Sequence, residues 1–309
     1  MMPAPQFPIP PPLARGPVQS GWVERSIQVA AGVLLPVRIY GQRTGSIPTS
    51  LVLHFHGGAF VGGSLENGST MARLLADAGA IVVSLDYPLA PGHPFPEAAD
   101  AGLAALAWLG RHRRRLGGEG APVLVAGEEA GGNLAAAITL MARDQHSPVL
   151  AGQVLVSPML DPCLGTASLR DADLSDEKCP WATGWRAYLA RASDVGHPYA
   201  APGICLRLGQ VPATLLITAE DDPLRDEALA YATKLAKAGV DVVQAVLPSP
   251  TGWPQSFMRS ESYDAGWAAT VREHLRRFIA ARQTATVPPC PAAAAWSGRS
   301  SPPASGASE

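Results

Sequence analysis

The sequence predicts one α/β domain built on a doubly wound, mostly parallel sheet. Short apolar runs alternate with segments of helical periodicity along most of the 309 residues, and this alternation is typical of such sheets. Residues 80–86 are almost continuously apolar, as expected for a strand buried on both faces. With 47% apolar and 16% charged residues, the chain can form a large core.

The elements are expected in a regular order. Residues 23–30 and 33–40 read as two strands of a hairpin, separated by Ala31-Gly32. The strands expected after the hairpin are 51–56, 80–86, 122–126, 153–157, 213–218 and 242–246. The expected helices are 71–78, 97–116, 131–143, 225–238 and 263–281.

Three segments interrupt this pattern. Residues 1–22 are rich in Pro and are expected to form an irregular lead-in to a domain spanning 23–283. Residues 284–309 are rich in Pro, Ala and Ser and are expected to be a disordered tail. The stretch 160–210 is rich in Pro, Gly and Trp and reads as an insertion.

Composition argues against several classes of function. The net charge is −2, and the densest basic run, Arg111–Arg115, is best explained as the solvated end of a helix, so no nucleic-acid partner is expected. The amino-terminal residues lack the features of a secretory signal, and no apolar run is long enough to span a membrane.

The four cysteines have no metal-ligand spacing, so no metal or other cofactor is expected. Reduced thiols in a cytoplasmic protein are the favoured interpretation, and a Cys163–Cys179 bridge is the alternative.

Four short motifs follow four of the expected strands. They are His56-Gly57-Gly58-Ala59, Asp86-Tyr87-Pro88-Leu89-Ala90-Pro91, Gly127-Glu128-Glu129-Ala130-Gly131 and Asp222-Pro223-Leu224-Arg225-Asp226-Glu227. In this order the chain resembles the hormone-sensitive-lipase-like carboxylesterases of the α/β-hydrolase fold, over about residues 25 to 280. The resemblance implies a cap over the site, formed by segments before about residue 40 and by the 160–210 insertion.

Glu129 stands where the resemblance places the nucleophilic serine. The motif G-x-S-x-G forms a strained strand-to-helix turn, the nucleophile elbow, and Gly127, Ala130 and Gly131 keep the small residues that this turn needs. The resemblance also implies an oxyanion hole made by the amides of Gly57, Gly58 and Ala130. We hypothesise that the Glu129 carboxylate occupies this hole, because the hole is shaped for an anion.

The other two triad positions also follow from the resemblance. Asp222 matches the catalytic acid, whereas Gln255 stands in the slot of the catalytic histidine. Glutamine cannot serve as a base near pH 7, but its amide is expected to hydrogen-bond to Asp222. Trp253 and Phe257, which flank Gln255, are expected to line a ligand pocket together with His56 and Phe60.

The aromatic residues of the insertion have two interpretations. Trp181, Trp185, Tyr188 and Tyr199 either line an apolar cavity or form the ordinary core of the cap.

Three hypotheses for function follow from these substitutions. The first is a pseudo-hydrolase that binds a small apolar, acyl or carboxylate ligand in a binding or regulatory role, with very low esterase activity. The second is a lyase, cyclase or dehydratase that uses Glu129 as acid or base. The third is a weak hydrolase of carboxylic esters. A homodimer is compatible with all three.

Overall fold

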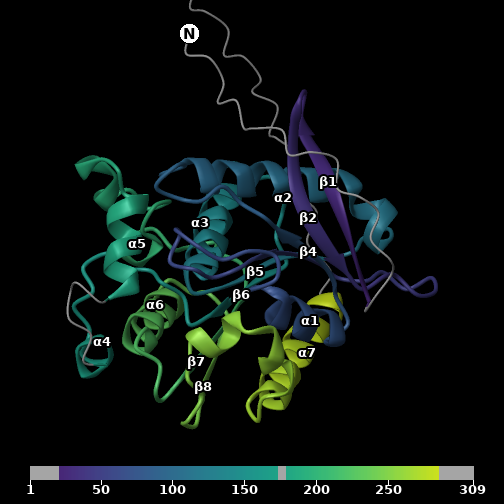
Figure 1. The fold of residues 1–309 in the computed structure, drawn as a ribbon. Coiled ribbons are helices and arrows are strands. Elements are labelled where there is room, and N and C mark those ends of the chain that lie inside the picture. The colour runs from purple at the N-terminus through teal and green to yellow at the C-terminus, as the bar shows by residue number, and fades with distance from the viewer. Residues whose placement is uncertain (1–20, 173–178, 285–309) are drawn as a thin grey trace, which may run out of the picture.

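A single eight-stranded sheet forms the centre of the molecule (Figure 1). The computed structural model describes residues 21–172 and 179–284. The strands are β1 (Trp22–Ala30), β2 (Val33–Tyr40), β3 (Leu51–Phe55), β4 (Ile81–Leu85), β5 (Val123–Glu128), β6 (Gly152–Val156), β7 (Thr214–Ala219) and β8 (Val242–Leu247). The helices are α1 (Ser69–Asp77), α2 (Glu97–Gly117), α3 (Ala130–Asp144), α4 (Ala167–Asp171), α5 (Pro180–Tyr188), α6 (Arg225–Lys237) and α7 (Ala268–Thr284).

The strand order is β1-β2-β4-β3-β5-β6-β7-β8. The hairpin of β1 and β2 joins β4 antiparallel, and all pairings from β4 to β8 are parallel. The predicted doubly wound, mostly parallel sheet is therefore confirmed. In such a sheet the turns at the carboxyl ends of the parallel strands converge, and ligand sites form at that edge.

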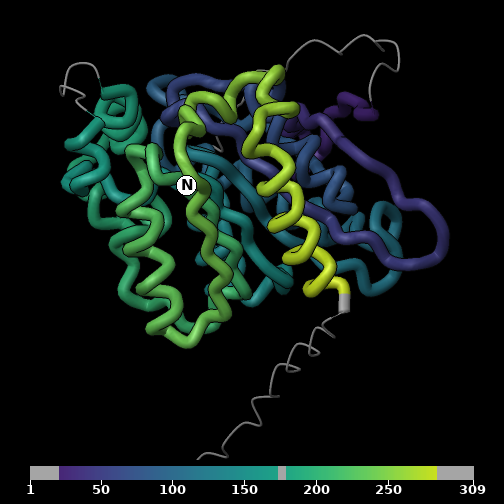
Figure 2. Tube along the Cα trace, turned by 90° about the horizontal axis from the view of Figure 1, so that it is seen from below, coloured from purple at the N-terminus to yellow at the C-terminus, as the bar shows by residue number. Residues whose placement is uncertain are grey.

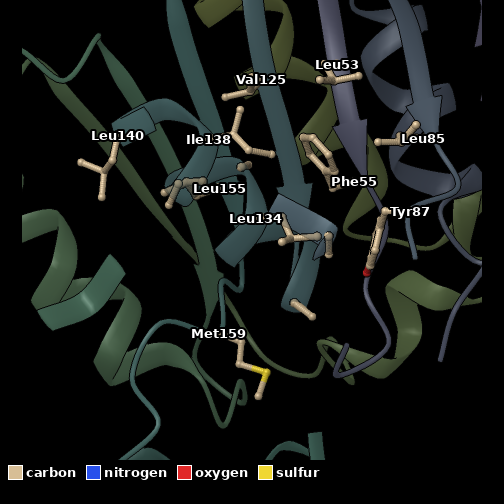
Figure 3. Close-up of a cluster of buried hydrophobic side chains, with 14 of the residues drawn as sticks. Leu53, Phe55, Leu85, Tyr87, Val125, Leu134, Ile138, Leu140, Leu155 and Met159 are labelled. Carbon is tan, nitrogen blue, oxygen red and sulfur yellow. The ribbon is translucent and has the colours of Figure 1, made fainter. Parts of the chain in front are cut away.

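Two large apolar clusters, one on each face of the sheet, hold the layers together, and a third, small cluster joins α6 to β7. On one face α2 packs against α3, and on the other α1 packs against α7, the yellow helix of Figure 2. Figure 3 shows how the first cluster is built, with side chains of β3, β5 and β6 meeting those of α3. Its labelled members on these elements are Leu53, Phe55, Val125, Leu155, Leu134, Ile138 and Leu140. Burial of this apolar surface is the main stabilising contribution to such a fold.

The predicted strands and helices agree with the observed ones to within a few residues, with one exception. The last helix begins at Ala268 rather than at residue 263, because residues before it form two short 3₁₀ helices, Gln255–Met258 and Ser260–Asp264. The Tyr263 hydroxyl donates to the Asp77 carboxylate of α1, which ties the second of these turns to the helix layer. The predicted irregular lead-in and disordered tail lie almost entirely outside the described residues and stay predictions.

The insertion between β6 and β7 contains α4, α5 and two 3₁₀ helices, Ala192–Gly196 and Pro202–Ile204. Helix α5 begins with Pro180 in its first turn, where the missing N–H costs nothing. It packs closely on the turn after β3, since a Cβ added to Gly184 would lie 2.1 Å from the Ala59 carbonyl oxygen. The insertion therefore reaches the carboxyl edge of the sheet, where the sequence motifs gather.

Candidate functional site

Glu129 lies at the tip of a sharp turn between β5 and α3. Its backbone has φ 53° and ψ −117°, a conformation that costs energy for a residue other than glycine. The neighbouring glycines make the turn possible. A Cβ on Gly127 would lie 2.1 Å from the Gly131 carbonyl oxygen, and one on Gly131 would lie 2.1 Å from that of Phe55. The turn thus has the form of a nucleophile elbow with a carboxylate at its tip.

One oxygen of the Glu129 carboxylate accepts three backbone hydrogen bonds. Its Oε2 atom lies 2.5 Å from the Gly58 nitrogen, 2.8 Å from that of Ala59 and 3.1 Å from that of Ala130. The hypothesis that this carboxylate occupies the ring of amides therefore agrees with the geometry. The position of the ring at the amino end of α3 adds a favourable field for an anion.

The donor set differs from the predicted one at one position. Ala59, rather than Gly57, supplies the third amide to Oε2. Gly58 has φ 126°, Ala59 has φ 50° and Phe60 has φ 63°, so the chain turns sharply at these residues. Gly57 instead faces the carboxylate with its α-carbon, since an added Cβ would lie 3.0 Å from Oε2.

The second oxygen of this carboxylate binds the insertion. Trp181 Nε1 of α5 donates to Oε1 of Glu129 at 2.7 Å. Trp181 is fully buried and Glu129 is 2% exposed. The carboxylate therefore has four donors in a site closed to water, and charge-assisted bonds of this kind are stronger than neutral ones. The sequence named Trp181 only as one aromatic residue of the insertion, and no local motif marks its partner.

Asp222 lies between β7 and α6, buried to the same degree as Glu129. Its Oδ2 accepts from the Thr218 hydroxyl at 2.6 Å, and its Oδ1 accepts from the Leu224 amide at 2.9 Å. Burial raises the pKa of Asp222, and the Thr218 hydroxyl, the Ser157 side chain and the Leu224 amide oppose the rise. The carboxyl group is thus satisfied by the end of β7 and by the turn that follows it.

The predicted hydrogen bond from Gln255 to Asp222 is wrong. Gln255 is exposed and makes no hydrogen bond to Asp222 in the structure. Its loop is fixed elsewhere by the neighbouring carboxylate of Asp221, which accepts from the Thr251 amide at 2.7 Å and the Gly252 amide at 2.9 Å. The next residues are tied to α1, since the Thr70 hydroxyl donates to the Arg259 carbonyl at 2.7 Å.

The four predicted pocket residues do not come together. Trp253 and Phe257 are buried in the cluster on the α1 and α7 face, where their rings lie 4.5 Å apart and each packs on Trp267. Phe60 belongs to the opposite cluster. With Trp253 and Phe257 directed into the core, the residue between them faces solvent, which explains the exposure of Gln255.

Phe60 packs against α5. Its ring stacks on Tyr188 with 3.9 Å between centroids and lies 5.2 Å from the ring of Trp185. Tyr199, the fourth aromatic residue of the insertion, lies apart from this set and donates to Asp144 at the end of α3. The aromatic residues of α5 thus form a core between the insertion and the turn after β3.

His56 supports the turn that carries the amides. Its Nδ1 donates to the Gly57 carbonyl at 2.7 Å, and its ring stacks on Tyr87 at 4.3 Å. The Tyr87 hydroxyl donates in turn to the His56 carbonyl at 2.7 Å. Burial lowers the pKa of His56 to about 4, against the hydrogen bond to Gly57, so this imidazole is neutral near pH 7 and positions the turn.

A second buried polar group lies beside the elbow and was not predicted. His54 Nε2 donates to Oε2 of Glu128 at 2.8 Å, and His54 Nδ1 lies 2.9 Å from the Ser84 hydroxyl oxygen. All three side chains are fully buried on neighbouring strands. A histidine and a glutamate within otherwise apolar strands are the sequence signal that would have revealed this pair.

Within residues 21–172 and 179–284, no group of three or more His, Cys, Asp or Glu side chains is placed to hold a metal ion. Cys163, Cys179 and Cys205 are free thiols, so the alternative of a Cys163–Cys179 bridge is wrong. None of the helices in this part of the chain is both long enough and apolar enough to cross a membrane.

Comparison with known proteins gives consistent matches. The sequence profile of the α/β-hydrolase fold family matches residues 52–250. An arylesterase of Saccharolobus solfataricus is 37% identical over 212 residues, which are 67% of this chain and 68% of that protein. The gibberellin receptor GID1B of Arabidopsis thaliana is 32% identical over 205 residues, 62% of this chain and 56% of that protein. Among solved structures, a hyperthermophilic esterase of Pyrobaculum calidifontis has a TM-score of 0.75 and 31% identity, covering 86% of this chain and 87% of that one.

Removal of His54 tests the buried pair. His54→Ala leaves the Glu128 carboxylate buried without its partner, so we expect the free energy of unfolding to fall by about 3 to 5 kcal/mol. Arg114→Ala, which breaks the Arg114–Glu119 pair at 87% and 80% exposure, should leave stability almost unchanged. Urea denaturation of both variants gives the comparison, and equal effects would show that the buried pair contributes nothing special.

The low pKa of His56 has a consequence for stability. The unfolded chain binds a proton on this side chain near its ordinary value of 6.5, whereas the folded chain does so only near 4. The stability due to neutral His56 is therefore fully present above pH 6.5 and is lost as the pH falls toward 4, by about 3 kcal/mol. Proton–nitrogen NMR of the imidazole should show His56 neutral and protonated at Nδ1 at pH 5.5, and a titration midpoint above 6 would contradict this.

Proposed function

Because this chain belongs to the hormone-sensitive-lipase-like family of α/β hydrolases, we propose that it is a non-hydrolytic member with a binding or regulatory role. Membership of the family by itself makes the chain an esterase-like α/β hydrolase. That the family also includes a protein named as a receptor supports a role without turnover.

One observation carries this proposal. The side chain at the nucleophile position accepts hydrogen bonds from the amides of Gly58, Ala59 and Ala130, the groups that would stabilise the oxyanion of an ester substrate. A carbonyl oxygen of a substrate therefore has no free donor set at the elbow. The nucleophile is replaced and the oxyanion hole is occupied by the same residue.

The second requirement of ester hydrolysis is a base beside the nucleophile, and neither Gln255 nor His54 nor His56 supplies it. Gln255 is exposed and separate from Asp222, and an amide cannot take up a proton near pH 7. His54 and His56 are fully buried and engaged with Glu128 and Gly57. Neither imidazole is available to activate a water molecule.

The proposal of an enzyme that uses Glu129 as acid or base has less support. Such a group must reach the proton of a substrate, but both oxygens of Glu129 are held by donors and the residue is 2% exposed. A weak hydrolase would need a nucleophile other than Glu129 beside an empty donor set.

The amides of the oxyanion hole are already bound to Glu129, which restricts the class of ligand that the site can accept. An acyl or carboxylate ligand must first displace the Glu129 carboxylate, so a small apolar ligand without that group is favoured for the parent protein. A homodimer stays a prediction.

Hydrolysis of p-nitrophenyl butyrate tests the proposal. The parent and Glu129→Gln should show no turnover above the uncatalysed rate. Glu129→Ser empties the hole and supplies a hydroxyl, so we expect a slow activity, about 10³- to 10⁴-fold over water. Adding Gln255→His should raise this rate less than tenfold, since position 255 faces solvent.

Two outcomes of that assay would change the conclusion. Turnover by the parent that Glu129→Gln abolishes would make the carboxylate catalytic and overturn the proposal. A large gain on adding Gln255→His would mean that this loop reaches Asp222 in solution, in contrast to its position in the structure.

Binding of butyrate tests the occupation of the hole directly. Glu129→Ala leaves the amides of Gly58 and Ala59 without their acceptor, so butyrate should bind this variant at least tenfold more tightly than it binds the parent. Isothermal calorimetry measures both, with the neutral isostere butyramide as a control that should discriminate less. Equal affinity of the two proteins for butyrate would show that the carboxylate does not block the hole.

A further inference from the structure

Helix α5 contacts the elbow region in two ways. Trp181 donates to the Glu129 carboxylate at 2.7 Å. The rest of the contact is packing on the turn after β3, where Gly184 lies against the Ala59 backbone and Tyr188 stacks on Phe60. The helix therefore covers both the tip of the elbow and the turn that supplies two of the three amides.

The bond from Trp181 differs in kind from the other side-chain contacts of this helix with the elbow region. Among the residues that the structure describes, the Trp185 indole nitrogen and the Tyr188 hydroxyl have no hydrogen-bond partner, so the contacts of these two side chains with Phe60 are apolar. Such packing is large in sum but sets orientation weakly. The bond to Glu129 is directional, charge-assisted and shielded from water, so it fixes α5 over the elbow, while the Phe95 amide holds the end of the helix by donating to the Tyr188 carbonyl at 2.9 Å.

Glu129 thus joins three separate parts of the chain. Its backbone belongs to the elbow, its Oε2 binds the amides of Gly58 and Ala59 in the turn after β3, and its Oε1 binds Trp181 in the insertion. In an open site, an oxygen of a bound ligand would accept the hydrogen bonds from the amides of Gly58 and Ala59 that Oε2 accepts here. Here the protein makes both contacts with its own side chain.

We propose that the Glu129 carboxylate is an internal ligand that latches α5 closed over the elbow. Entry of any ligand to the elbow then requires the Trp181–Glu129 bond to break, so cap opening and the state of Glu129 are coupled. This latch extends the proposed function and rests on it in one respect. The Glu129 carboxylate must stay in the oxyanion hole and must not react with a substrate.

A pair of matched substitutions on the same helix tests the latch. Trp181→Phe removes the indole N–H that binds Glu129, whereas Trp185→Phe removes an indole N–H without a partner in residues 21–172 and 179–284. Both changes replace an indole by a smaller phenyl ring, so their effects on packing are similar. Hydrogen exchange measured by mass spectrometry on peptides that cover α5 should accelerate tenfold or more in Trp181→Phe and less than threefold in Trp185→Phe.

Glu129→Gln gives an independent measurement. An amide has one acceptor oxygen, and three backbone donors compete for it against a single indole. We expect the oxygen to stay with the amides of Gly58 and Ala59, and the NH₂ group then faces the indole N–H of Trp181. Exchange should therefore accelerate in α5 while the turn after β3 stays protected.

The double variant Trp181→Phe with Glu129→Gln completes the cycle. If the two residues act through one bond, its exchange in α5 should be no faster than that of the faster single variant. Independent, multiplicative accelerations would overturn the latch, as would equal exchange in Trp181→Phe and Trp185→Phe. Ester turnover by the parent would overturn the proposed function alone, because exchange in α5 does not depend on that assay.

Discussion

The site depends on the need of a buried carboxylate for hydrogen-bond donors. Moving an ionised carboxylate out of water costs many kcal/mol unless donors replace its hydration. Glu129 finds four such donors, three backbone amides and the Trp181 indole. Elbow, turn and insertion therefore all donate to one group, and the bond from Trp181 ties the insertion to the other two.

The donor set exists because the backbone around it is fixed independently of the side chain at the tip. Gly127 and Gly131 allow backbone contacts that a Cβ would block. The positive φ angles at Gly58, Ala59 and Phe60 turn the chain at the amides. Since none of these features requires a serine, the elbow tolerates a glutamate, and a site shaped for a transient anion holds a permanent one.

Two adjacent glutamates are accommodated at this edge of the sheet by different means. Glu128 projects to the α1 and α7 face, where His54 and Ser84 form its polar surroundings. Glu129 turns away from the strand toward the amides and α5. Successive side chains of a strand point to opposite faces of the sheet. The sharp turn at Glu129 then directs its carboxylate away from that of Glu128.

The sequence alone determined the order of strands and helices, the mostly parallel sheet, the elbow and the identity of residue 129, because these depend on local periodicity and on short motifs. Only the tertiary structure decided what the site residues contact. Ala59 in place of Gly57, the Trp181 bond and the exposure of Gln255 all depend on segments far apart in the chain. The positions of Trp253 and Phe257 are set by the burial of apolar surface. This burial depends on the whole fold and cannot be deduced from a local sequence pattern.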